Sequence, residues 1–242
     1  MSIYFTADAH LGGRCHPDPP AVERRMVRWL ESVHLDAQAI WFLGDTFDYW
    51  FEYRHVIPKG YTRFFGKLAE LADDGIELHF FTGNHDVWLF DYLPEQLGAV
   101  IHRTPLIVDL LGTTFFLAHG DEADPNPAFR LLRTLFRSPL CQSLYAAIHP
   151  RWSMAFAHRW SYRSRSSHSC KPENLTPYID FAQTAVQSDP DIAYLIFGHL
   201  HCPLELPLSP PNTVPRLFIL GDWITSPTSL RWDGQTLSYH PC

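Results

Sequence analysis

Short apolar runs bounded by turn residues alternate along this chain with stretches of helical periodicity. This alternation favours an α/β protein over an all-β one. The runs predict strands at 3–7, 39–43, 77–82, 106–110, 114–118, 193–197 and 217–220, with a closing hairpin that turns at Asp233-Gly234. The periodic stretches predict helices at 20–33, 61–73 and 177–187. In the last of these, Thr176 is the expected N-cap and Pro177 the first helical residue.

The strand signal disappears between residues 121 and 171. Apolar residues recur there at helical spacing, at 132, 135 and 136, then 140, 144 and 148, then 152, 156 and 160. We therefore predict a core formed by 1–122 and 172–242, interrupted by a helical, basic insertion at 123–171. Residues 125–175 carry eight Lys and Arg against one acidic residue, while the rest of the chain carries a net charge of −14. The insertion is either a solvated arginine-rich surface or a lid over an anionic ligand.

Composition excludes several classes of protein. The 242 residues carry a net charge of −7 and are 46% hydrophobic, which excludes a disordered chain and a basic nucleic-acid coat. The five scattered cysteines contain no C-x-x-C pair, which argues against a disulfide framework or a zinc knuckle and favours a reducing compartment. The N-terminal residues do not resemble a signal peptide, and no apolar run approaches the ~18 residues of a membrane span. We expect a cytoplasmic protein.

Metal-binding residue types follow the ends of several predicted strands. They are Asp8, His10, Asp45, Asn84, His119, His199 and His201. Strand ends in open α/β sheets converge on one crevice, so these side chains can meet. In Asp-x-His and His-x-His, alternate residues of an extended segment would point the same way. Carboxylate and amide oxygens with imidazoles suit Mn²⁺, Fe²⁺ or Zn²⁺, whereas the lack of thiolates disfavours a structural zinc site.

Each such signal is weak alone, because a single His-x-His is more often a surface or core feature. Five motifs in order carry more weight: Asp-Ala-His (8–10), Gly-Asp-Thr-Phe-Asp (44–48), Gly-Asn-His-Asp (83–86), His-Gly-Asp (119–121) and Gly-His-Leu-His (198–201). Together they resemble the calcineurin-like metallophosphoesterase superfamily. The resemblance implies a four-layer α/β/β/α sandwich with a dinuclear metal centre at its rim. It places Asp8, His10 and His201 on one metal and Asn84, His119 and His199 on the other, with Asp45 bridging.

The chemistry accounts for these residue types. Two divalent ions balanced by two carboxylates keep roughly two positive charges to meet a phosphate. A pair of such ions can also activate water and clamp phosphoryl oxygens. Besides Asp45, we expect His85 to be catalytic, by stabilising or protonating the leaving oxygen, with Asp86 or Asp48 orienting imidazoles. The alternative for His85 is a structural turn histidine.

Two aromatic segments point to one branch of this superfamily. Residues 47–53 (FDYWFEY) and 87–92 (VWLFDY) look like the bacterial UDP-2,3-diacylglucosamine diphosphatase family. That family implies hydrolysis of the nucleotide-linked diacyl sugar to UMP and 2,3-diacylglucosamine 1-phosphate in lipid A synthesis, usually with manganese. One position departs from the best-known form of the family, which has Arg where this chain has His85. The departure does not affect the prediction of a phosphoesterase, but a histidine at this position is shared with enzymes that act on unrelated phosphodiesters.

The insertion suits such a substrate. Arg130, Arg133 and Arg137 fall on one helical face, and apolar residues cover much of the rest, namely Phe129, Leu132, Leu135 and Phe136. Cations would serve phosphates, an apolar groove would serve acyl chains, and the pattern also fits peripheral attachment to the anionic inner membrane. An ordinary helix packed on the core is the alternative. The expected substrate contacts are Asn84, His85, Ser161, Arg163, Ser164, Arg165 and His199.

Two other functions compete with this one. A general metal-dependent phosphodiesterase or nucleotidase would share the ligand set, but a body with a net charge of −14 offers no long cationic track for nucleic acid. A non-catalytic scaffold that binds a protein partner should have lost metal ligands, and the sequence lacks none of the seven. The oligomeric state is not indicated by the sequence.

Overall fold

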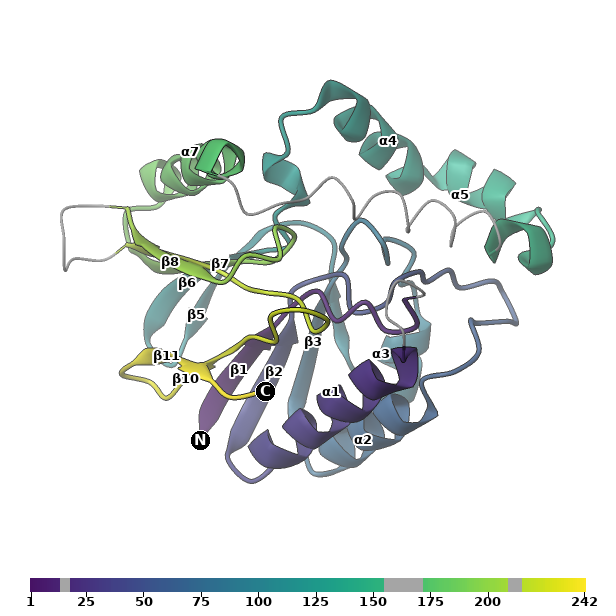
Figure 1. Ribbon diagram of the computed structural model, residues 1–242, viewed down its shortest axis with the longest axis horizontal. Helices are drawn as coiled ribbons and strands as arrows, with labels where there is room; N and C mark the ends of the chain where they lie inside the picture. Colours follow the sequence, from purple (N-terminus) through teal and green to yellow (C-terminus); the bar gives the residue numbers. More distant parts are fainter. Residues whose placement is uncertain (14–17, 155–171, 209–214) are drawn as a thin grey trace.

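The fold is a sandwich of two β-sheets covered by helices on both outer faces (Figure 1). The computed structural model describes residues 1–13, 18–154, 172–208 and 215–242. The first sheet has the order β11-β10-β1-β2-β3-β4 and the second β5-β6-β7-β9-β8. Their bounds are β1 Ser2–Thr6, β2 Ala37–Phe42, β3 Glu77–Phe81, β4 Val100–His102, β5 Leu106–Leu110, β6 Thr113–Ala118, β7 Ile192–Phe197, β8 Leu204–Pro207, β9 Arg216–Ile219, β10 Ser229–Trp232 and β11 Leu237–His240.

The central strands of both sheets run parallel, which brings their carboxyl ends to one edge. Strands β1 to β4 pair in parallel in the first sheet. Strands β6, β7 and β9 do the same in the second. Antiparallel strands complete the first sheet with β10 and β11 and the second with β5 and β8. Loops that follow the parallel strands therefore lie close together.

Three apolar layers hold the sandwich together. Helices α1 (Pro19–Val33), α2 (Thr62–Asp73) and α3 (Tyr92–Leu97) cover the first sheet, burying Met26, Leu68 and Phe80 among others. Side chains such as Phe5 and Phe115 fill the space between the sheets. Helix α7 (Pro172–Ser188) covers the second sheet. Because strand side chains alternate between faces, each sheet supplies two of these layers, and the predicted four-layer α/β/β/α sandwich is confirmed.

Helices α4 (Pro127–Arg137) and α5 (Pro139–Ala146) lie outside these layers. Figure 1 shows them side by side beyond the end of the sandwich. Each begins with a proline at its first turn, and the Asn126 side chain caps α4 by accepting a hydrogen bond from the backbone of Ala128. Neither helix contains a buried residue. They supply the described helices of the predicted insertion.

Most predicted elements are present within two residues of their expected bounds, including the hairpin between β10 and β11. The short strands β4 and β8 and the short helix α3 were not predicted. The expected start of α7 is wrong: the helix begins at Pro172, so that Pro177 lies inside it and Thr176 is no N-cap. Every helix in the described ranges is too short or too polar to cross a bilayer.

The state of three cysteines bears on the sequence-based expectation. Cys141 and Cys242 are free, and Cys202 is disulfide-bonded. One disulfide is not the disulfide framework that the cysteine spacing argues against, but it does not favour the expected reducing compartment.

Candidate metal centre

The seven predicted ligands meet at the edge where the strands of both sheets end. Asp8 and His10 follow β1, Asp45 follows β2, Asn84 follows β3, His119 follows β6, and His199 and His201 follow β7. All but Asn84 and His201 are buried, and those two are partly exposed. The topology thus collects residues up to 193 positions apart in the sequence.

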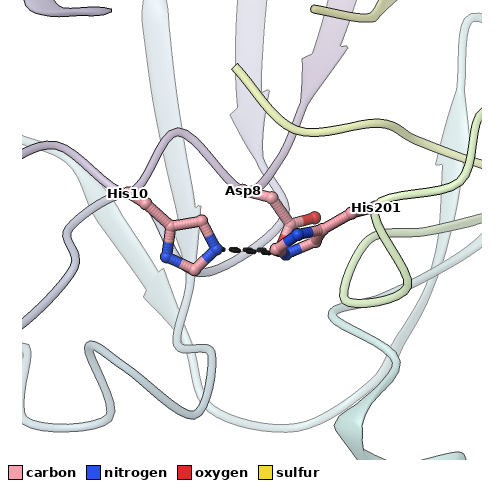
Figure 2. A group of neighbouring side chains, drawn as sticks. All are labelled: Asp8, His10 and His201. Atoms are coloured by element: carbon pink, nitrogen blue, oxygen red, sulfur yellow. Dashed lines mark hydrogen bonds and ion pairs between the residues drawn. The ribbon is translucent and has the colours of Figure 1, made fainter. Parts of the chain in front are cut away.

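Asp8, His10 and His201 form the first group (Figure 2). The Nε2 atoms of His10 and His201 lie 3.1 Å apart. Oδ1 of Asp8 lies 3.3 Å from His201 Nε2 and 3.9 Å from His10 Nε2. One ion could contact all three residues at once.

Asp45, His119 and His199 form the second group. Nε2 of His119 lies 3.6 Å from Asp45 Oδ2 and 3.3 Å from Asn84 Oδ1, which adds the amide to this group. The same Asp45 oxygen lies 3.8 Å from His10 Nε2 in the first group. Asp45 therefore stands between the two groups, where a bridging carboxylate would have to be. A third arrangement, His10 with Asp48 and His85, overlaps the first group.

The backbone around the ligands is unusual. Five of them have left-handed conformations, with φ from 44° to 68°: Asp8, His10, Asp45, His199 and His201. Such angles are uncommon for residues with a Cβ and concentrate at functional sites. The expectation that Asp-x-His and His-x-His act as extended segments is therefore wrong. His199 and His201 in fact belong to different groups.

Two glycines leave room for the carboxylates. A Cβ at Gly83 would overlap Oδ1 of Asp45 and lie 2.6 Å from the Asp45 backbone nitrogen. A Cβ at Gly198 would lie 2.6 Å from Oδ2 of Asp8. The glycines before Asn84 and His199 are thus required by the close approach of the ligand side chains.

Surrounding groups orient two imidazoles. Nδ1 of His119 lies 2.8 Å from the carbonyl oxygen of Leu43, and because a carbonyl only accepts, Nδ1 carries the proton and Nε2 faces the centre with its lone pair. Nδ1 of His201 lies 3.4 Å from Oδ2 of Asp222, which has the same effect. Sequence analysis missed Asp222. Its signal was a Gly-Asp pair after a strand, the same pattern as Gly44-Asp45.

The expected role of Asp86 is wrong. Its carboxylate accepts hydrogen bonds from the backbone nitrogens of Gly83, Asp45 and Phe47, at 2.8 to 3.2 Å, and so ties the loop after β2 to the loop after β3. Asp48 lies nearer the imidazoles, with Oδ1 3.8 Å from His85 Nδ1 and 3.9 Å from His10 Nδ1. Of the two aspartates expected to orient imidazoles, Asp48 is the one that lies beside them.

His85 lies beside Asp45. Its backbone nitrogen donates to Asp45 Oδ1 at 2.8 Å, and its Nε2 is 4.0 Å from Asp45 Oδ2. Nδ1 lies 3.0 Å from the carbonyl oxygen of Asp48, so Nδ1 carries the proton and the Nε2 edge faces the centre. This geometry suits a group that touches a bound phosphate.

The donor set fits divalent cations. Asp8 Oδ1 is fully buried and accepts no hydrogen bond within the described chain, which is costly unless a cation lies nearby. Burial alone would raise the pKa of Asp45, but the nearby imidazoles of His119, His85 and His10 hold it well below its usual range. Carboxylate and amide oxygens with imidazole nitrogens are the ligands of Mn²⁺, Fe²⁺ and Zn²⁺.

The two aromatic segments form a surface on which the helical insertion docks. Tyr49, Phe51 and Trp88 cluster with Phe136 and Tyr145 from α4 and α5. Nε1 of Trp88 donates to the Phe136 carbonyl at 3.0 Å, and the hydroxyls of Tyr49 and Tyr145 are 3.1 Å apart. We call this cluster the aromatic seat. The aromatic seat therefore attaches the insertion to the core.

Two of the three arginines of α4 pair with carboxylates, whereas Arg130 is exposed. Arg133 Nε lies 3.2 Å from the buried carboxylate of Asp121, and Arg137 lies 3.6 Å from it. Arg133 also pairs with Glu122 at 3.2 Å. Asp121 directly follows the His119-Gly120 pair, so these ion pairs anchor the insertion beside the metal centre. Ser161, Arg163, Ser164 and Arg165, the expected substrate contacts, lie outside the described residues.

Comparison with known proteins identifies a family and relatives of this chain. Residues 1–203 match the family described as calcineurin-like phosphoesterase. A curated protein from Porphyromonas gingivalis, UDP-2,3-diacylglucosamine hydrolase, is 46% identical over 97% of this chain and 95% of its own length. A protein of the same name from Nitrosococcus oceani is 29% identical over 92% and 88%. A solved structure described as a predicted phosphoesterase from Streptococcus pneumoniae aligns over 98% and 86% at 11% identity, with a TM-score of 0.46.

Proposed function

Since this chain belongs to the calcineurin-like phosphoesterase family, we propose that it hydrolyses UDP-2,3-diacylglucosamine to UMP and 2,3-diacylglucosamine 1-phosphate, a step of lipid A synthesis. The observation that carries the proposal is the nearly full-length similarity to the Porphyromonas gingivalis hydrolase. The aromatic seat supports it, because the seat joins the predicted insertion to the core beside the ligands. The reaction is a hydrolysis of a phosphoric anhydride.

The chain's own residues would hold two divalent ions, for which we propose Mn²⁺, with Fe²⁺ or Zn²⁺ as alternatives. Asp8, His10 and His201 would bind one ion, Asn84, His119 and His199 the other, and Asp45 both. When bound, the ions supply Lewis acidity and an activated water for attack on phosphorus. The Leu43 carbonyl and the Asp222 carboxylate hold the imidazoles of His119 and His201 in the orientation and tautomer that turn Nε2 toward the centre.

We assign His85 to the phosphate. Its Nε2 edge faces the centre, where it can donate to a phosphoryl oxygen once protonated, or protonate the leaving oxygen. Asn84 and His199 would contact the substrate from the other side. Ser161, Arg163, Ser164 and Arg165 remain proposed contacts to the sugar and phosphate, on the strength of their donor chemistry.

The α4–α5 segment offers an apolar surface for the acyl chains or for the membrane that holds them. Large apolar side chains are exposed along it: Leu131, Leu135, Leu140, Leu144, Ile148 and Trp152. Leu140 and Leu144 lie one turn apart on α5, and Ile148 and Trp152 follow the end of that helix. Leu140 is 69% exposed and Trp152 is 70% exposed, far more than large apolar side chains that pack against a protein core. We propose that the protein is cytoplasmic and works at the surface of the inner membrane.

The test is product release. Purified protein with Mn²⁺ should release UMP, measured by chromatography, from UDP-2,3-diacylglucosamine, and should hydrolyse a simple aryl phosphodiester far more slowly. The reverse pattern would favour the second candidate, a general phosphodiesterase, which is supported by the generic histidine at His85. An absence of any hydrolysis together with a metal-free protein would favour a scaffold.

The membrane surface can be tested separately. Changing both Leu140 and Leu144 to Ser should reduce cosedimentation with vesicles of phosphatidylethanolamine and phosphatidylglycerol. Leu35→Ser is the matched control. Leu35 is also an exposed leucine, 97% exposed, but it follows α1 and does not belong to the α4–α5 segment. Equal binding by the wild type and the double variant would remove this surface from membrane contact.

A further inference from the structure

A pocket of about 320 Å³ opens beside the candidate metal centre. Its lining includes Gly12, Glu23, Tyr49, Lys59 and Tyr61. Two lining residues are close in sequence to residues at the centre. Gly12 is two residues after the ligand His10, and Tyr49 directly follows Asp48, which lies beside the imidazoles of His10 and His85. Two residues span at most ~7 Å, so the pocket adjoins the centre. No residue of the pocket belongs to the ligand set.

We propose that this pocket binds the nucleoside half of a nucleoside diphosphate substrate. The inference rests on the proposed function, whose substrate carries a nucleoside on one side of the cleaved diphosphate and the diacyl sugar on the other. The pocket's volume lies at the lower end of the ~300–1,000 Å³ typical of small-molecule sites. It therefore suits a nucleoside, and it is too small for a diacylated sugar.

The aromatic lining of the pocket is rigid. Tyr61 packs against Phe47 and Trp50, with ring centroids 5.1 and 6.1 Å apart. It also packs so closely on Gly12 that a Cβ there would overlap its hydroxyl, and both residues have left-handed φ, 61° for Tyr61 and 81° for Gly12. A tyrosine fixed in this way offers a preformed surface to a flat base.

The polar groups of the pocket are placed to bind sugar and base. Oε1 of Glu23 accepts hydrogen bonds from the backbone nitrogens of Arg63 and Phe64 at 3.0 and 3.2 Å, which fixes the carboxylate. The other Glu23 oxygen accepts no hydrogen bond in the described chain, and neither the Tyr61 hydroxyl nor the Lys59 ammonium has a partner there. Burial and the nearby Glu23 raise the pKa of Tyr61 to about 12, so the phenol remains a donor.

These groups favour a nucleoside over an acyl chain. A carboxylate oxygen can accept from ribose hydroxyls, as it does in dinucleotide-binding sites, while an ammonium and a phenol can donate to carbonyl or phosphate oxygens. An acyl chain in the same place would remove Glu23 and Lys59 from water without supplying any partner. The exposed apolar side chains of the α4–α5 segment are the better surface for acyl chains, although Met154 lines one side of the pocket.

Binding measurements with separate products test the proposal. Isothermal titration of the Mn²⁺-loaded protein with UMP and with 2,3-diacylglucosamine 1-phosphate would be compared for the wild type, Lys59→Ala and Tyr61→Phe. Each variant should bind UMP about five- to tenfold more weakly, the usual effect of one lost hydrogen bond. Binding of the lipid product should change less than about twofold. Glu23 is left intact because it caps the start of α2.

Matched controls are Arg28→Ala on exposed α1 and Tyr239→Phe on β11, which should leave UMP binding unchanged. The proposal is overturned if the Lys59→Ala/Tyr61→Phe double variant binds UMP as the wild type does, or if only lipid binding weakens, which would assign the pocket to an acyl chain. The outcome is separable from the proposed function: a protein that does not cleave UDP-2,3-diacylglucosamine but loses UMP binding in these variants refutes the function and retains the pocket.

Discussion

The metal centre and the helical insertion are held in contrasting ways. The ligands are almost all buried, five have left-handed backbones, and Asp86 ties their loops together through backbone hydrogen bonds. Helices α4 and α5 contain no buried residue and rest on the aromatic seat and on ion pairs to Asp121. Fixed side chains suit the proposed binding of two cations, and attachments of modest strength would let the insertion move if it covers the substrate as proposed.

The largest effect should follow from Asp45→Asn, because Asp45 stands between both groups of ligands. We expect a loss of about 3 kcal/mol or more of transition-state stabilisation, at least about a hundredfold in kcat. Mass spectrometry of bound metal should show both ions reduced. Asp73→Asn, on the exposed end of α2, is the control. Full turnover by the Asp45 variant would show that Asp45 does not bridge two metal ions.

A pair of glycine substitutions tests how rigid the centre is. Gly83→Ala would drive a Cβ into Asp45, with an expected loss of about 3 kcal/mol in the free energy of unfolding or an equivalent loss of metal. Gly66→Ala adds a Cβ in open space on exposed α2 and should raise stability by about 0.5–1 kcal/mol. Chemical denaturation measures both. Similar effects at the two sites would contradict the idea of a tightly packed centre.

The insertion should respond differently, as a pair of arginine substitutions can show. Arg133→Ala removes a partner of buried Asp121. It should lower the free energy of local unfolding of α4 by about 1–3 kcal/mol. Hydrogen exchange in α4 should rise and KM for the acylated substrate should increase, with metal content unchanged. Arg130→Ala is the matched control, because Arg130 is exposed and its side chain makes no ion pair within the described chain. Loss of metal from the Arg133 variant would mean that centre and insertion are not independent.

Much of the fold could be predicted from the sequence because the signals are local. Strands such as β1 and β7 are short apolar runs whose ends carry the ligands, so the motifs and the topology point to one edge. Strands β4 and β8 contain no buried residue, so they lack the apolar run that reveals β9, which is as short as β8. The start of α7 was missed because the Thr176-Pro177 pair imitates a helix N-terminus.

At the site, too, local signals were predictable and contacts between distant segments were not. Residue types and order indicated which side chains could meet. The left-handed backbones at Asp8 and His10, however, accompany backbone hydrogen bonds to the loop after β2, and spacing along the chain does not encode such contacts between distant segments. The role of Asp86 was misjudged because a carboxylate beside histidines looks like an imidazole partner, and only the structure shows it bound to backbone nitrogens. Arg133 and Arg137 likewise looked free in the sequence, since their partner Asp121 precedes α4.

The smallest effect should come from a single hydroxyl in the aromatic seat. Tyr145→Phe removes the contact with the Tyr49 hydroxyl and the hydrogen bond to the Ser153 carbonyl at 3.0 Å, but keeps the ring stacked on Trp88. Because the ring supplies the apolar contact, only about 0.5–1.5 kcal/mol should be lost, as increased hydrogen exchange in α5. Tyr239→Phe on β11 should leave exchange in α5 unchanged. A larger loss than that of Arg133→Ala would mean that hydrogen bonding in the seat, and not the ion pairs to Asp121, is the main attachment of the insertion.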